Sequence, residues 1–144
     1  MSDKPKLSRH AAREIAFQLL FAKEFDKEAD ALSFYENHAD NSETEYNDYI
    51  RSTFLGVCEK LPELDPVIEE ASIKWKMSRM STATRTVLRL AVYEMTCTDI
   101  PAKVVLNEAV EIIKKFDDEN ATAFVNGILN RIARDGSKIE GENA

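Results

Sequence analysis

Apolar residues recur at helical spacing along most of the chain. After Ser8, a residue type that favours helix starts, Ile15, Leu19 and Ala22 share one side of a first helix. Comparable stripes predict further helices near residues 28–38, 43–60, 66–75, 84–97, 100–116 and 121–135. No segment alternates convincingly in the manner of a strand. The pattern therefore predicts an all-α fold of about seven helices.

The best internal boundary is the segment LPELDP, residues 61–66. Each of its prolines removes an amide donor and disfavours helix in the residue before it. The 144 residues suit a single helical domain. Within it we expect an N-terminal helical subdomain, residues 1–61, a C-terminal helical subdomain, residues 66–135, and a flexible tail, residues 136–144.

Gly127 interrupts the last predicted helix, one turn after Phe124. An interior glycine costs a helix about 1 kcal/mol relative to alanine, so close packing against another backbone or room for a ligand must offset it. We favour close packing against a neighbouring backbone, which would hold Phe124 at the surface in a fixed direction.

Charge is distributed unevenly around a net value of -7. Residues 1–13 carry four cations against a single acid, and residues 74–93 carry five cations and no acid, whereas residues 24–48 are strongly acidic. Two basic islands could place an anion on one side of the molecule. The alternative is that both islands are solvated surface.

Motifs for catalysis, membranes and cofactors are scarce. No apolar run is long enough for a membrane span and no secretion signal is recognisable, which favours a cytoplasmic protein. Cys58 and Cys97 lack metal or redox spacing and are expected to be buried free thiols. Glu108 and Glu111 could pair as acid and base, but we expect one of them to meet Arg85 or Arg89. The sequence predicts no enzyme, metal or cofactor.

Three linked motifs make the C-terminal half recognisable: LRLAVYE, PAKVVLNEAVEIIKKF and FVNGIL, in that order. Together with the opening RHAAREIAFQLLFAKEF, they resemble the NusB family of transcription antitermination factors. The resemblance implies seven helices in two packed helical subdomains. It also implies binding rather than catalysis: family members, together with ribosomal protein NusE, recognise the single-stranded boxA element of ribosomal RNA leader transcripts and help RNA polymerase read through termination signals.

The resemblance also implies roles for particular residues. Basic side chains near the N-terminus would neutralise RNA phosphates, Gln18 would meet a base edge and Phe124 would stack on a base. NusE would dock beside them, while Arg89 is expected to be structural. The implied RNA-binding residues are Lys4, Lys6, Arg9, His10, Arg13, Gln18 and Phe124, and the implied partner-binding residues are Thr84, Arg85 and Asn120.

Two alternatives stay open. Phe124 could serve core packing instead of RNA, since aromatic residues at helical spacing are usually core. The whole chain could be a non-catalytic protein-interaction module with little RNA binding of its own, for example a homodimer that packs away the face of Phe17 and Phe21.

Overall fold

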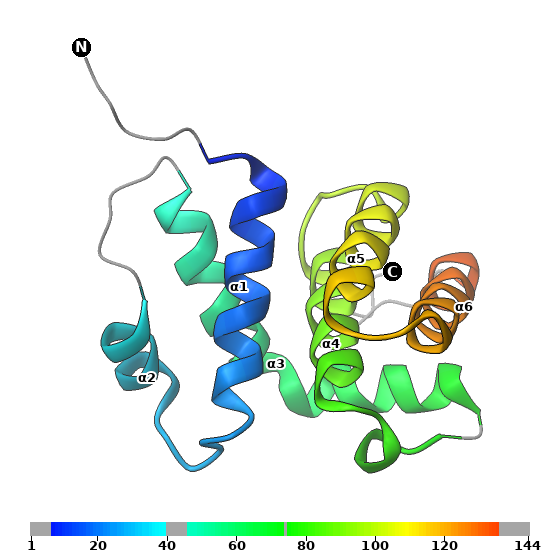
Figure 1. Ribbon diagram of the computed structural model, residues 1–144, viewed down its shortest axis with the longest axis horizontal. Coiled ribbons are helices and arrows are strands. Elements are labelled where there is room, and N and C mark those ends of the chain that lie inside the picture. Colours follow the sequence, from blue (N-terminus) through cyan, green and yellow to red (C-terminus); the bar gives the residue numbers. More distant parts are fainter. Residues whose placement is uncertain (1–6, 40–45, 74, 136–144) are drawn as a thin grey trace. The chain divides into compact units, whose positions relative to one another are not determined.

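Helices are the only regular secondary structure in the parts that the computed structural model describes, residues 7–39, 46–73 and 75–135 (Figure 1). No strand occurs in these ranges, so the all-α prediction is confirmed. The elements are α1 (Arg9–Lys23), α2 (Ala31–His38), α3 (Asn47–Ser72), the 3-10 helix η1 (Met77–Arg79), α4 (Thr82–Cys97), α5 (Ala102–Phe116) and α6 (Glu119–Asp135).

The helices separate into two compact units, residues 1–58 and residues 59–144. The first unit contains α1, α2 and the N-terminal part of α3. The second contains the rest of α3 together with η1 and helices α4 to α6. One helix therefore contributes to both units.

Helix α3 continues through both prolines of residues 61–66, so the predicted break there is wrong. Pro62 and Pro66 are exposed and four residues apart, which puts them on one solvent-facing side where carbonyls without an amide donor can bind water. Leu64 and Ile68 are fully buried. Burial of this apolar side keeps the helix continuous, and the two helices expected over 43–60 and 66–75 are one.

The first unit is built around aromatic residues from three helices. Ser8 caps α1 by accepting from the Ala11 amide at 3.0 Å, and Asp30 caps α2 by accepting from the Ser33 amide at 3.0 Å. The rings of Phe34 and Phe54 stack at 5.9 Å. These caps and ring contacts fix where α1 and α2 begin and how α2 lies on α3.

The C-terminal end of α1 exposes apolar surface. Phe21 packs edge-on against Phe25 with ring centroids 5.3 Å apart, and Phe25 is 72% exposed. Phe17 is buried. A partner could therefore contact the side chain of Phe25, but not that of Phe17.

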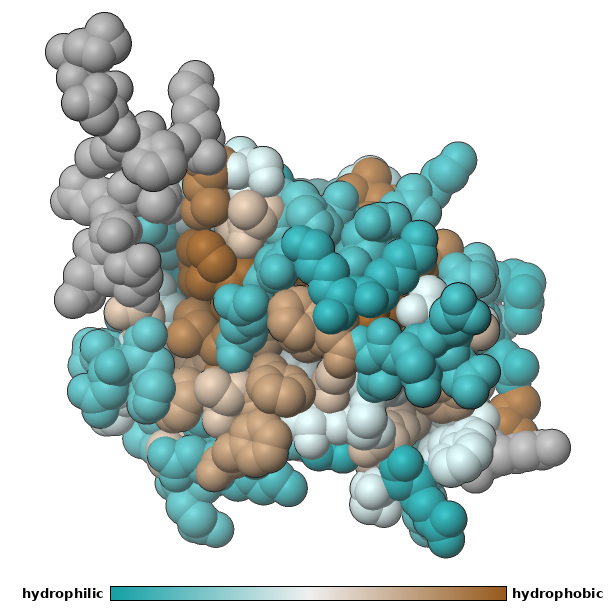
Figure 2. Space-filling view, viewed as in Figure 1, coloured by the Kyte–Doolittle hydropathy of each residue, from teal (hydrophilic) through white to brown (hydrophobic). Residues whose placement is uncertain are grey.

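Helix α4 is the centre of the second unit. Ten of its residues are buried, and α5 and α6 pack against it. Val105, Ile112 and Ile113 on α5 and Val125, Leu129 and Ile132 on α6 complete this core. Hydrophilic side chains cover the outward side of α5 (Figure 2). The expected stripe of α6 is confirmed, and that of α5 is confirmed except at Phe116, which was expected on the buried seam but is 39% exposed at the end of the helix.

Arg89 holds α4 to α3. Its guanidinium makes two hydrogen bonds of 2.9 Å to the Asp65 carboxylate, one to each oxygen. Both side chains are partly buried, and two parallel bonds add geometric specificity to the charge attraction. The expected structural role of Arg89 is confirmed, with Asp65 as a partner that the sequence pattern did not identify.

The cysteines differ from expectation. Neither forms a disulfide, as expected, but Cys97 is exposed at the last residue of α4 and Cys58 is only half-buried. The prediction that both are buried is wrong: Cys97 is exposed because it lies at the end of a helix, and Cys58, inside α3, is only partly covered.

Gly127 does not pack closely against a neighbouring backbone. A Cβ atom built at this position meets no heavy atom within 4 Å in the described residues, and the residue is exposed on α6. The packing explanation is therefore wrong. Among the described residues, nothing packs into the space of the missing side chain, so the glycine lowers helix stability without a compensating contact.

Replacing Gly127 with alanine is expected to raise the free energy of unfolding by about 0.5–1 kcal/mol, because alanine has less backbone freedom to lose and meets no obstacle. Urea denaturation followed by the fluorescence of Trp75, which lies in the same unit, measures this change. The reverse substitution at exposed Ala123 on the same helix is the control and should cost a similar amount. A destabilised Gly127→Ala variant would show that this position is crowded after all.

Candidate nucleic-acid interface

The first turn of α1 is basic where helices usually carry acids. It holds Arg9 and His10 and no acidic residue. The N-terminal end of a helix already carries a partial positive charge and amides without intrahelical partners, so added cations there oppose the stability of the free chain. The same arrangement favours an anion bound at this end.

Arg9 and Arg13 differ in accessibility. Arg9 is exposed, and its guanidinium carbon lies 4.6 Å from the ring centroid of Tyr49 and 5.1 Å from that of Tyr46. Arg13 is only 3% exposed and lies 5.7 Å from the Tyr49 ring. Arg9 can therefore reach a ligand directly, whereas Arg13 acts mainly inside the fold.

The remaining RNA-binding candidates of the first unit lie on another side of α1. His10 and exposed Gln18 are eight residues apart and share the stripe of Glu14, whose carboxylate lies 4.0 Å from the His10 ring. Nine residues separate Arg9 from Gln18, which is about half a turn in angle, so their side chains leave α1 in opposite directions. Lys4 and Lys6 fall outside the described residues.

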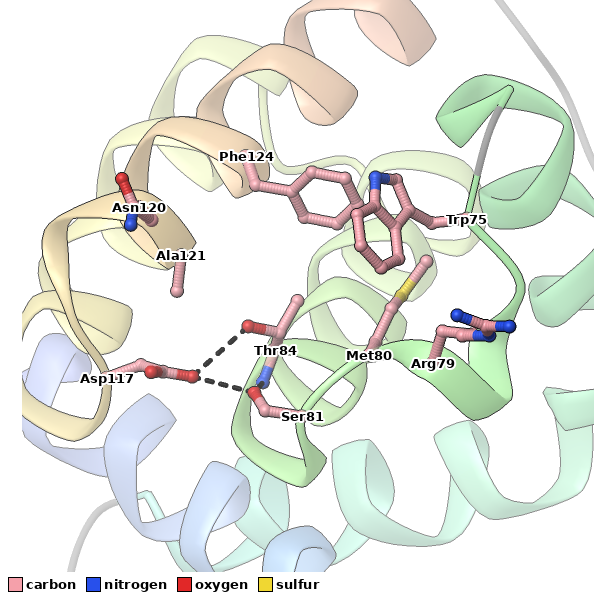
Figure 3. Close-up of a pocket in the computed structure, with 9 residues that line it drawn as sticks. All are labelled: Trp75, Arg79, Met80, Ser81, Thr84, Asp117, Asn120, Ala121 and Phe124. Carbon is pink, nitrogen blue, oxygen red and sulfur yellow. Dashed lines mark hydrogen bonds between the residues drawn. The ribbon is translucent and has the colours of Figure 1, made fainter.

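A pocket of about 280 Å³ opens at the N-terminal end of α4 (Figure 3). It brings together three candidate residues from separate segments: Thr84 from α4, and Asn120 and Phe124 from α6. Its other lining residues are Trp75, Arg79, Met80, Ser81, Asp117 and Ala121. One wall is apolar and aromatic and the other carries polar groups, which is typical of a recognition site.

The polar wall is a hydrogen-bonded junction between helix ends. Ser81 caps α4 by accepting from the Thr84 amide at 3.0 Å, and its hydroxyl donates to Asp117 Oδ2 at 2.7 Å. The Thr84 hydroxyl also donates to this oxygen, at 3.4 Å. The Ser81 hydrogen bond, followed by those from Asp118 and Thr84, holds the pKa of Asp117 below its ordinary value despite partial burial. Asp117 thus remains charged and fixed in place.

The aromatic wall contains a residue that sequence reasoning missed. Trp75 is 47% exposed and meets Phe124 edge-on, with ring centroids 6.4 Å apart (Figure 3). The sequence pattern placed Trp75 at the end of a helix, but α3 ends at Ser72. The sequence feature that could have identified Trp75 is its place in the second basic island, residues 74–93, which also contains Arg79.

Two of the proposed partner contacts already have structural roles. The Arg85 guanidinium donates to the carbonyls of Met77 and Met80, at 3.1 and 2.9 Å, and so fixes the segment that carries η1. Thr84 lines the pocket but is only 4% exposed, so it offers a partner little surface. Asn120, in contrast, is exposed at the rim.

Catalytic and membrane features do not emerge from the described ranges. Glu111 lies 3.5 Å from Lys114 on the exposed side of α5 rather than in a paired-acid site. No group of three or more metal-ligating side chains occurs in these ranges. None of the described helices combines the length and apolar character needed to cross a membrane.

An all-helical domain with a basic helix start and an aromatic, polar-edged pocket defines a binding protein, and comparison with known proteins gives its family. The NusB family model matches residues 10–134. The transcription antitermination protein NusB of Anaeromyxobacter dehalogenans is 41% identical over 127 residues, covering 87% of this chain and 89% of that protein. The chain belongs to the NusB family.

Solved structures agree with this assignment. One of T. maritima NusB has 37% sequence identity and a TM-score of 0.82, and it covers 90% of this chain and 93% of its own. A crystal structure of the antitermination factors NusB and NusE in complex with double-stranded RNA has 26% identity and a TM-score of 0.74, covering 88% of this chain and 96% of that chain.

Replacing Ser81 with alanine is expected to lower the free energy of unfolding by about 1 kcal/mol, because α4 loses its N-cap and Asp117 loses its closest hydrogen bond. Ser78, an exposed serine of η1, provides the control, and its change to alanine should leave stability nearly unchanged. Chemical denaturation of both variants measures the difference. If the Ser81→Ala and Ser78→Ala variants were equally stable, the proposed role of Ser81 as the N-cap of α4 would be contradicted.

Asp117 is expected to make stability depend on pH in the acid range. Its folded pKa is below the ordinary 3.8, so its contribution is present above about pH 4 and is lost as pH falls through the lower folded pKa. The Asp117→Asn variant should lose less stability than the unmodified protein between about pH 5 and about pH 2.5. Denaturation midpoints across this range test it, and parallel curves for the two proteins would contradict it.

Proposed function

We propose that this chain is an RNA-binding transcription antitermination factor that recognises boxA-type single-stranded RNA of ribosomal RNA leader transcripts together with ribosomal protein NusE. It acts by binding, not by catalysis, in the cytoplasm, and joins the antitermination complex of RNA polymerase. Membership of the NusB family supports this proposal. So does the structural neighbour described as NusB and NusE with RNA.

The observation that carries the RNA proposal is the acid-free first turn of α1 with Arg9 exposed on it. The chain as a whole is acidic, so general attraction to polyanions does not explain such a local concentration of positive charge. A phosphate placed there meets the positive helix end and a guanidinium together. We assign the phosphate contacts to Arg9 and His10, with Arg13 in support.

The pocket at the start of α4 is the proposed site for NusE and a base. Asn120 offers both donor and acceptor at the rim, and Phe124 offers a partly exposed ring face beside Trp75. Single-stranded RNA is recognised mainly through such unstacked bases on aromatic side chains. The other candidate function, a homodimer through the face of Phe17 and Phe21, is less favoured because Phe17 is buried.

Binding to a labelled boxA-like single strand is expected to exceed binding to a scrambled strand, and NusE should widen the difference. Replacing Arg9 with alanine should weaken binding of both strands and reduce the slope of log affinity against log salt by about 0.7, the value for one phosphate contact on a single strand. Fluorescence anisotropy at several salt concentrations measures both effects.

Arg51, an exposed arginine of the first unit on α3, is the matched control. Its change to alanine removes the same charge but should leave the slope almost unchanged. A duplex RNA of the same sequence tests whether a single strand is required. If neither strand binds at low salt with NusE present, the RNA proposal fails and the protein-interaction module is the better description.

Replacing Phe124 with leucine is expected to weaken binding of boxA-like RNA about five- to 150-fold, since base stacking on an aromatic ring contributes about 1–3 kcal/mol. Phe116, which is 39% exposed on α5, is the control, and its change to leucine should leave RNA affinity unchanged. Thermal denaturation of both variants separates lost binding from lost packing. Unchanged RNA affinity in Phe124→Leu would assign the ring to packing alone.

A further inference from the structure

Two tyrosine rings of one helix start surround the Arg9 guanidinium. Tyr46 immediately precedes α3 and Tyr49 lies in its first turn, and their ring centroids are 5.1 and 4.6 Å from the guanidinium carbon. In the described residues, Arg9 has no carboxylate partner. Its position is therefore set by the aromatic rings.

Such contacts leave the binding capacity of arginine intact. A ring attracts the guanidinium through the face of the planar group, whereas the five N–H donors point outward in its plane. A carboxylate partner would occupy those donors and cancel the charge. Tyrosines hold the side chain without doing either.

Tyr49 also supports a pair of like charges. Arg9 and Arg13 are four residues apart on α1, a spacing at which two cations repel each other. The Tyr49 ring lies 4.6 Å from one guanidinium carbon and 5.7 Å from the other. Its electron-rich face attracts both, so Arg9 can remain near α3 while Arg13 is buried.

We propose that Tyr46 and Tyr49 are positioning residues for RNA binding, which hold the Arg9 guanidinium with its N–H donors directed toward a phosphate. The inference rests on the proposed RNA-binding function. A side chain that is ordered before binding loses less freedom when the phosphate arrives. Loss of either ring should therefore weaken RNA affinity even though neither ring needs to touch RNA.

A double-mutant cycle tests this positioning role. Tyr49→Leu and Tyr46→Leu are each expected to lower affinity for boxA-like RNA about two- to tenfold and to shift the salt slope toward that of Arg9→Ala. In the Arg9→Ala background, Tyr46→Leu should have no further effect, whereas Tyr49→Leu can still act through Arg13, which lies 5.7 Å from the Tyr49 ring. Tyr49→Phe and Tyr46→Phe keep the ring face and should restore binding to near the original level.

Tyr35 provides the aromatic control, because its ring lies in the same unit against Phe54. Tyr35→Leu should leave RNA affinity unchanged in protein that retains its helix content by circular dichroism. If Tyr49→Leu does not fold, Tyr46→Leu carries the test, since Tyr46 lies just outside α3.

The outcomes separate this inference from the function on which it rests. No RNA binding by the unmodified protein overturns the proposed function. Weakened binding in Arg9→Ala but not in the leucine variants overturns the positioning role alone. A loss of affinity that persists for Tyr46→Leu in the Arg9→Ala background also overturns it, because the Tyr46 ring then acts on RNA without Arg9.

Discussion

The burial of α4 is the constraint on which the second unit depends. A helix that buries ten residues must be covered on most sides, and α5 and α6 provide much of that cover. Its long sides are therefore largely occupied by packing. Chemistry that a partner can reach must then lie near a helix end, and the pocket is found at the N-terminal end of α4, where α5 ends and α6 begins.

The junction at that end explains why the pocket keeps its shape. Ser81 satisfies a free amide of α4 and at the same time donates to Asp117, the residue that follows α5. Asp118 continues the arrangement by accepting from the Ala121 amide at the start of α6. Three helix ends are thus fixed by short side chains, so the neighbouring aromatic residues project from a rigid base.

The sequence was informative where helical spacing and burial agree. The stripes of α5 and α6 and the N-cap at Ser8 follow directly from residue pattern. The prolines misled because a local rule for helix breaking was outweighed by burial of Leu64 and Ile68 on the opposite side. At Gly127 the prediction of close backbone packing was wrong, because the loss of helix stability at a glycine does not show what, if anything, offsets that loss.

The arginines show why the candidate site was harder to predict than the fold. The sequence alone does not distinguish these arginines, but their contacts in the fold do. Arg85 donates to backbone carbonyls and Arg89 binds Asp65, whereas Arg9 meets only ring faces in the described residues. The first two have donors committed to the fold. Arg9 keeps its charge and its donors, because tyrosine is the partner that holds a guanidinium without neutralising it. Its availability for a phosphate is therefore a property of Tyr46 and Tyr49, whose rings lie over the guanidinium.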